Sequence, residues 1–123
     1  MKKLSYIFMS VIFIISLTGC SPTFNGSRTG NDSKFIMEYT VFNTTDSQDL
    51  YVEAGDKISA NVVVNDGQLS IKVQKGKEEP VYEKENISVS DDFDIDIEES
   101  GTYTVTVTGK KTKGSVRFIV ENN

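Results

Sequence analysis

The chain has 123 residues, with 13 Lys and Arg against 18 Asp and Glu, a formal net charge of −5, no His, no Trp and one Cys. This length fits one domain at most. Without an imidazole, and with a single thiol, the chain cannot build a Ser-His-Asp or Cys-His catalytic site, a His-ligated metal site or a disulfide. Most familiar hydrolase mechanisms are therefore excluded, and we expect a protein that is not an enzyme.

The first segment has the layout of a secretory signal peptide. Met1-Lys2-Lys3 is positively charged, and the run from Leu4 to Leu17 is apolar apart from three serines and one tyrosine. A permanent membrane span needs roughly 18 to 20 apolar residues, so this run is too short for one and fits a signal core better. The sequence thus predicts a removable leader over residues 1–19.

The end of this leader, Leu17-Thr18-Gly19-Cys20, resembles the lipobox of bacterial lipoproteins. The resemblance implies that a diacylglycerol is attached to the Cys20 thiol and that the chain is cut just before it. We expect no other cofactor. Two acyl chains are enough for stable anchoring. The expected location is the extracytoplasmic face of the cell membrane. The alternatives are an ordinary signal peptide with a coincidental Cys, or an anchor that is not cleaved.

Charge and composition then describe the mature chain. Loss of Lys2 and Lys3 leaves 11 basic against 18 acidic side chains, a net charge of −7, which argues against nucleic acid as a partner and against adhesion to anionic lipid headgroups. Residues 20–34, which comprise Cys20 and the polar segment SPTFNGSRTGNDSK, show no helical or strand period. We therefore expect a lipidated Cys followed by a flexible tether that reaches about 20 Å from the membrane.

Residues 35–123 carry an alternating apolar pattern typical of half-buried strands. An Asn65-Asp66-Gly67 turn predicts a β-hairpin, and Gly109 to Gly114 predicts a second, basic hairpin loop. The pattern as a whole predicts an all-β domain, an antiparallel β-sandwich of about 7–8 short strands. The alternating sets lie at 35–41, 50–54, 58–64, 69–73, 81–82, 87–89, 93–97, 103–107 and 116–120.

One acidic strand is the main charge cluster of this domain. Alternation places four carboxylates on one face, about 6.5 to 7 Å apart along the strand, which is too far for one ion to bridge many of them; no metal site is predicted. The face is either solvated and paired with lysines, or a surface for a ligand or partner. The four carboxylates are Asp92, Asp94, Asp96 and Glu98, and the candidate lysines are Lys72, Lys110, Lys111 and Lys113.

Two further patterns have both structural and functional interpretations. The threonines at 102, 104, 106 and 108 fit strand propensity on an exposed face, and could also form a flat ligand-binding surface. Tyr51 and Tyr82 could stack on a carbohydrate or peptide, although such rings are more often buried with a hydrated hydroxyl.

The order of turns and strands from Ala54 to Val120 resembles small extracytoplasmic GOLD-like or immunoglobulin-like adaptor domains, and includes a Ser100-Gly101-Thr102-Tyr103 run. This resemblance implies a non-catalytic binding role and assigns no functional residue. We therefore expect a membrane-anchored module that binds another envelope protein or a cell-surface ligand. A structural or protective envelope component that acts through its acidic surface, and a minimal carboxylate hydrolase, are the alternatives.

Overall fold

The computed structural model describes residues 22–122, and these form seven strands and no helix. The expected leader and lipobox, including Leu17, Thr18, Gly19 and Cys20, lie outside the described residues. Within residues 22–122 there is no helical segment with the length and hydrophobicity to cross a bilayer. The strands are β1 (Phe24–Gly30), β2 (Lys34–Phe42), β3 (Thr45–Val52), β4 (Lys57–Lys75), β5 (Tyr82–Ile87), β6 (Asp91–Asp96) and β7 (Gly101–Glu121).

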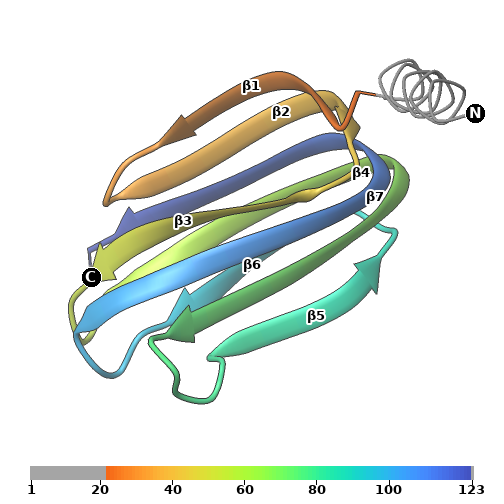
Figure 1. Ribbon diagram of the computed structural model, residues 1–123. Coiled ribbons are helices and arrows are strands. Elements are labelled where there is room, and N and C mark those ends of the chain that lie inside the picture. Colours follow the sequence, from red (N-terminus) through yellow and green to blue (C-terminus); the bar gives the residue numbers. More distant parts are fainter. Residues whose placement is uncertain (1–21, 123) are drawn as a thin grey trace, which may run out of the picture.

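All strand pairs are antiparallel, and the long strands β4 and β7 run through two sheets. The first sheet has the order β1-β2-β7-β4-β6, and the second has the order β3-β7-β4-β5. Figure 1 shows β4 and β7 bending together at the end of the molecule where β1 begins. The fold is an antiparallel β-sandwich, which confirms the predicted class.

The two predicted hairpins are wrong, because the halves of each long strand do not pair with each other. In β4, Ile58 is opposite Val120 in the first sheet and Val73 is opposite Val105 in the second, so β7 is the partner of both halves. The chain does reverse direction near residues 65–67 and 109–114, but as a bend between facing sheets. A turn sequence favours a reversal and does not specify which strand pairs with which half.

Each bend contains one extra residue, and this keeps the apolar side chains pointing inward. The β4–β7 register shifts between Val64 and Asp66 and again between Asp66 and Gln68. A bulge places two successive side chains on one face, after which the alternation resumes displaced by one residue. Buried positions accordingly change from even to odd numbers along β4 and from odd to even along β7: Ile58, Ala60, Val62, then Leu69, Ile71, Val73; and Tyr103, Val105, Val107, then Thr112, Val116, Phe118.

Two glycines and one threonine hold the bend. Gly67 has φ +75°, and a Cβ there would overlap the carbonyl oxygen of Lys111. Gly114 has φ +149°, and a Cβ there would overlap the carbonyl oxygen of Val63. Thr112 is fully buried; its hydroxyl donates to the Gln68 carbonyl and accepts from the Lys110 N–H at 3.0 Å. These polar contacts supply backbone groups of the bend with partners that a regular ladder would otherwise provide.

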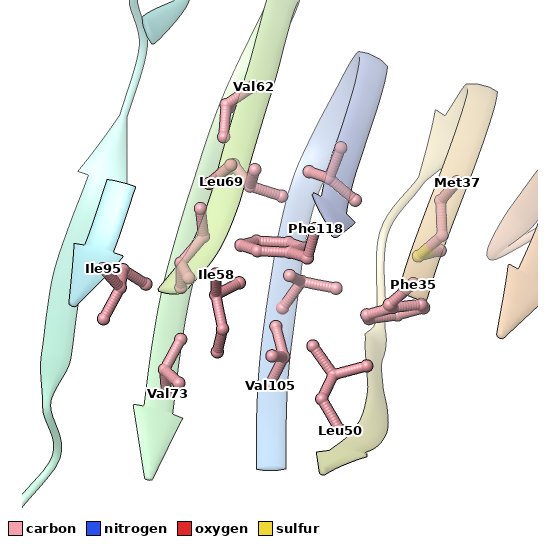
Figure 2. Close-up of a cluster of buried hydrophobic side chains, with 14 of the residues drawn as sticks. Phe35, Met37, Leu50, Ile58, Val62, Leu69, Val73, Ile95, Val105 and Phe118 are labelled. Carbon is pink, nitrogen blue, oxygen red and sulfur yellow. The ribbon is translucent and has the colours of Figure 1, made fainter. Parts of the chain in front are cut away.

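The core lies between the two sheets, and its side chains come from six strands and from Ile97 (Figure 2). Most of the predicted inward positions are buried, since a sheet face that meets another sheet excludes water from alternate residues. Ala54, Val81 and Val89 are exceptions, and all three are exposed in connections between strands. Residues 81–89 contain one edge strand, β5 (Tyr82–Ile87), where two short strands were expected.

The tether prediction is wrong for residues 24–30 and for Lys34, which lie in strands. Residues 24–30 form β1, which pairs with β2 from Phe24 opposite Phe42 to Gly30 opposite Phe35. The Phe24 ring packs edge-on against Tyr39 and Phe42, with ring centroids 6.4 and 6.1 Å apart. This segment lacked a strand signature because it is an edge strand whose other side chains are exposed and polar.

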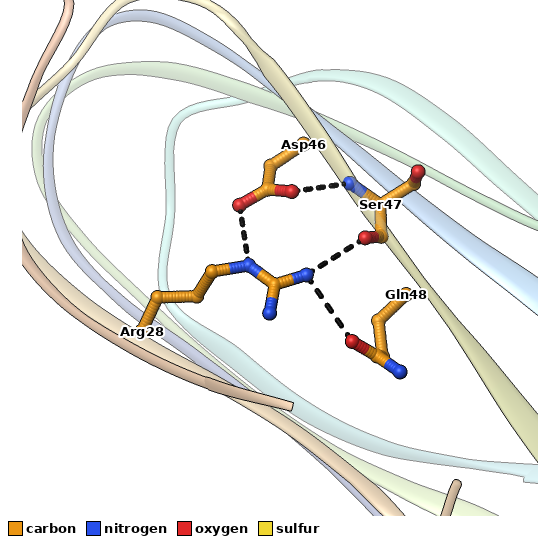
Figure 3. Close-up of polar contacts among 4 residues, drawn as sticks. All are labelled: Arg28, Asp46, Ser47 and Gln48. Carbon is orange, nitrogen blue, oxygen red and sulfur yellow. Dashed lines mark hydrogen bonds and ion pairs between the residues drawn. The ribbon is translucent and has the colours of Figure 1, made fainter. Parts of the chain in front are cut away.

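Arg28 connects β1 to β3 across the side of the sandwich (Figure 3). Its Nε donates to Asp46 Oδ2 at 2.8 Å, and its Nη2 donates to the Ser47 carbonyl at 2.8 Å and to Gln48 Oε1 at 3.2 Å. The guanidinium carbon also lies 4.8 Å from the centroid of the Phe35 ring. One side chain thus joins an edge strand of the first sheet to an edge strand of the second.

The opposite side of the sandwich is closed by aromatic packing. Tyr82 of β5 stacks on Phe93 of β6, with centroids 4.5 Å apart and an interplanar angle of 17°. Phe93 therefore covers one face of the Tyr82 ring, and that face is not available for the stacking on a ligand that the sequence had suggested for this tyrosine. Burial raises the pKa of its hydroxyl, and the nearby Asp91 raises it further.

Candidate functional site

The two ends of the sandwich differ in structure and in charge. We call the end with the bends of β4 and β7 the corner end; it also holds the start of β1 and the connections at 43–44 and 88–90. We call the other end the open end; it holds the connections at 31–33, 53–56, 76–81 and 97–100, and Asn122. The candidate site lies at the open end.

This site is a cleft of about 580 Å³ with an acidic lining. It lies between the β1–β2 connection, the end of β3, the β3–β4 turn and the end of β7. Tyr51 is the one aromatic side chain of the lining and is 50% exposed. The lining residues are Asp32, Ser33, Tyr51, Glu53, Asp56, Val120 and Asn122.

Backbone hydrogen bonds fix the walls of the cleft. The Tyr51 N–H donates to the Asp32 carbonyl at 2.8 Å, and the Val120 N–H donates to the Ser33 carbonyl at 2.9 Å. On the other wall, the Asp56 N–H donates to the Glu53 carbonyl at 3.0 Å. Because strand ends and a tight turn hold them, the carboxylates of the cleft are presented on a rigid frame rather than on a long loop.

The charge of the cleft is negative, and two lysines at the same end are committed elsewhere. Lys57 lies 3.2 Å from Asp94 and Lys75 lies 2.6 Å from Glu99. Hydrogen bonding to Asp94 raises the pKa of Lys57. The Lys75–Glu99 hydrogen bond raises the pKa of Lys75 and lowers that of Glu99. Within residues 22–122 no lysine or arginine is among the lining residues, so the cleft is suited to a cationic group, with the Tyr51 ring as an apolar or cation–π surface.

The predicted acidic face is present on β6 and the segment that follows it. Asp92, Asp94 and Asp96 lie along β6, an edge strand, and Glu98 follows it; all four are exposed. Asp92 accepts a hydrogen bond from Asn61, and Asp94 pairs with Lys57. Within residues 22–122 there is no cluster of three or more carboxylate or thiol groups placed to hold a metal ion.

The lysines expected to partner this face do not do so. β6 pairs with the first half of β4, whereas Lys72 lies in the second half, opposite Glu83. Lys110 donates to the Asn86 side chain at 3.3 Å, at the corner end. The prediction failed because it depended on strand order, and alternation along a strand carries no information about its neighbours.

The threonine row lies on the outer face of the second sheet and makes cross-strand contacts. Thr104 donates to Asp49 Oδ1 at 2.6 Å, and the hydroxyls of Thr108 and Thr45 are 3.1 Å apart. A shallow depression of about 170 Å³ lies beside it, lined by Ser70, Ile71, Lys72, Glu83, Glu85, Thr106 and Thr108. These cross-strand contacts explain the row of threonines by their structural role in the sheet.

The sequence did not reveal the acidic cleft. Its lining comes from residues 32–33, 51–56 and 120–122, which only the strand order brings together. The available signal was weak: acidic side chains in the predicted turns that flank the strands. Tyr51 was singled out by sequence, but its acidic neighbours were not.

Comparisons with known proteins support the fold. No protein-family model and no curated protein matches the chain. One similar solved structure is the pre-peptidase C-terminal domain of a collagenase from Bacillus anthracis, with a TM-score of 0.50 and 13% sequence identity, covering 83% of this chain and all of that one. The chain is thus similar in fold to this domain.

Proposed function

We propose that this chain is a non-catalytic binding module of the cell envelope, anchored through a diacylglycerol on Cys20, whose open-end cleft binds a basic segment of another extracytoplasmic protein. The observation that carries the proposal is the position of the acidic cleft with Tyr51 at the end opposite Phe24, where β1 begins. An anchor at one end leaves the other end accessible. The similarity in fold to the pre-peptidase C-terminal domain of a collagenase supports the β-sandwich on which this site is built.

The anchor is tested on protein isolated from its native host. Intact mass spectrometry should show a chain that begins at Cys20 and carries a diacylglycerol, and Cys20→Ser should abolish both cleavage and membrane retention. The lipobox resemblance is the basis of this expectation. An unmodified thiol, or a chain that keeps residues 1–19, would contradict it.

The cleft is tested by site-specific photo-crosslinking in the native host. A benzoylphenylalanine in place of Tyr51 should give an adduct of defined mass, and the same group in place of the exposed Lys84 on β5 should not. Charge reversal of the cleft (Asp32→Lys with Glu53→Lys) should lower the Tyr51 adduct roughly tenfold, since a basic partner then meets like charge.

A matched charge reversal on β6 serves as the control. Asp92→Lys with Asp96→Lys changes the net charge by the same amount but lies outside the cleft. This variant should keep the Tyr51 adduct. Loss of the adduct in the β6 variant alone would assign binding to the acidic strand, and absence of any Tyr51 adduct would overturn the proposal.

A further inference from the structure

The proposed lipid attachment lies close to the corner end of the sandwich. Phe24 is opposite Phe42 in the β1–β2 ladder, and the Asn43 N–H donates to the Thr23 carbonyl at 2.8 Å. Thr23 is three residues after Cys20, and an extended chain spans at most about 3.6 Å per residue. The Cys20 Cα is therefore within about 11 Å of the Thr23 Cα, where a flexible tether of fourteen residues would have allowed the domain to drift away.

Three exposed lysines lie at this same end. Lys110, Lys111 and Lys113 occupy the bend of β7. The Lys111 N–H donates to Asn43 Oδ1 at 3.0 Å, and Asn43 is the residue that also bonds Thr23. Among residues 22–122 none of these lysines forms an ion pair with a carboxylate, although Asp66 is opposite Lys113 in the ladder.

An exposed apolar side chain is also at the corner end. Val89 is 73% exposed, in the connection between β5 and β6. The next residue, Ser90, accepts a hydrogen bond at 3.0 Å from the N–H of Val64, which lies at the β4 bend. Asp91, at the start of β6, is the acidic group nearest to it in sequence. Cationic side chains together with an exposed apolar one are the composition that favours the membrane interface.

We infer that the corner end docks on anionic phospholipid headgroups, so that the domain stands upright on the membrane with its cleft facing away. This inference rests on the proposed anchoring at Cys20. The chain carries a net charge of −5, or −7 without residues 1–19, but fields are screened within about 8 Å at physiological ionic strength, so the lysines nearest the bilayer decide the contact. The sequence-based expectation that the protein does not adhere to anionic headgroups considers only the net charge. It does not take into account that the three lysines lie at the corner end and the acidic cleft at the open end.

The chain offers a matched pair of reporter positions. It contains no Trp, and it has exposed valines at opposite ends, Val89 at the corner end and Val81 at the open end. The full chain, carrying Val89→Trp or Val81→Trp, is coupled through its single thiol at Cys20 to a maleimide lipid. The vesicles contain phosphatidylcholine with brominated acyl chains, with or without one third phosphatidylglycerol. This coupling supplies the anchor whether or not the native chain is acylated, so failure of the docking is distinguishable from failure of the proposed lipidation.

Docking predicts that Val89→Trp is quenched on vesicles with phosphatidylglycerol and that Val81→Trp is not. Raising the salt to 1 M shortens the screening length to about 3 Å and should remove the quenching. Equal quenching at both positions, or none at Val89→Trp, would overturn the inference.

Charge variants test the role of the lysines. Lys110→Glu, Lys111→Glu and Lys113→Glu together should lower the docked-to-undocked ratio roughly a hundredfold, because each lysine contributes a factor of about five. The control Lys77→Glu, Lys84→Glu and Arg117→Glu makes the same net change at exposed positions away from the corner end and should leave quenching in place. The leader is common to all variants and cannot account for a difference between them. An unchanged signal in the corner variant would also refute the inference.

Discussion

At the scale of single residues, Tyr39 is a buried polar group without a partner. Its side chain is 5% exposed, and its hydroxyl has no hydrogen-bond partner within residues 22–122. Burial raises its pKa from 10.0 to about 12. An unpartnered buried hydroxyl is destabilising relative to an apolar group of the same shape.

Tyr39→Phe should therefore raise the free energy of unfolding by about 1 kcal/mol at pH 7. It should also reduce the loss of stability in alkali. Between pH 10 and 12 the unfolded tyrosine is ionised while the folded one keeps its proton, so the unfolded state binds fewer protons and stability falls as pH rises, by about 2 kcal/mol over the whole window. Urea unfolding at pH 7 and pH 11 measures both effects. A variant that is less stable at pH 7 would indicate that the hydroxyl has a partner.

Other residues set limits to what sequence reasoning could find. Thr112 is the one fully buried polar side chain of the described core, and nothing in a Lys-Lys-Thr-Lys segment marks it as buried. Phe24 looked like a lone apolar residue in a polar segment, yet it packs on two aromatic rings. In both cases the environment is created by a strand distant in sequence.

At the scale of elements, the shared bend of β4 and β7 is the least conventional feature. Gly67 and Gly76 both have positive φ, +75° and +55°, but a Cβ at Gly67 would overlap two carbonyl oxygens of β7, whereas a Cβ at Gly76 would meet open space. Alanine at Gly76 therefore measures the cost of backbone strain alone, and alanine at Gly67 measures that cost together with steric overlap.

Gly76→Ala should lower stability by about 1 kcal/mol, the cost of a left-handed conformation. Gly67→Ala should lower it by about 3 kcal/mol or more, because β4 and β7 must also move apart at the bend. Thermal or urea unfolding of both variants provides the measurement. Equal effects would mean that the bend tolerates a side chain, contrary to the close approach of the two strands.

The sequence predicted most elements and their inward faces because alternation is a local property of a strand. It did not predict β1, whose single buried ring leaves no period to detect, nor the bends, because Asn65-Asp66-Gly67 favours both a hairpin and an arch. The change from even to odd buried positions along β4 was visible in the sequence. It indicates a bulge only once the two halves are known to share one partner strand.

At the scale of the whole molecule, β4 and β7 make the two sheets interdependent. Each strand contributes one half to each sheet, so neither sheet can unfold while the other keeps all its ladders. The fold should thus behave as one cooperative unit, as small domains usually do.

Ile58→Val and Ile71→Val test this cooperativity with the same change in each half of β4, at sites that are both fully buried. Each should lower the unfolding free energy by about 1 kcal/mol, with one transition and an unchanged denaturant slope. Circular dichroism and tyrosine fluorescence, followed through the same titration, should coincide. Two transitions, or a reduced slope in one variant only, would show that the sheets separate.

The placement of β1 has a mechanical consequence. Its first residue lies at the corner end, and the acidic cleft lies at the far end, so tension between membrane and partner would run along the strand axes. Antiparallel hydrogen bonds are perpendicular to the strands, and such a pull loads the β1–β2 bonds together, in shear, instead of opening them one by one. Arg28, which ties β1 sideways to β3, opposes the sliding that shear requires. With the proposed anchor at Cys20, β1 would thereby be oriented to resist a pull on a partner bound in the cleft.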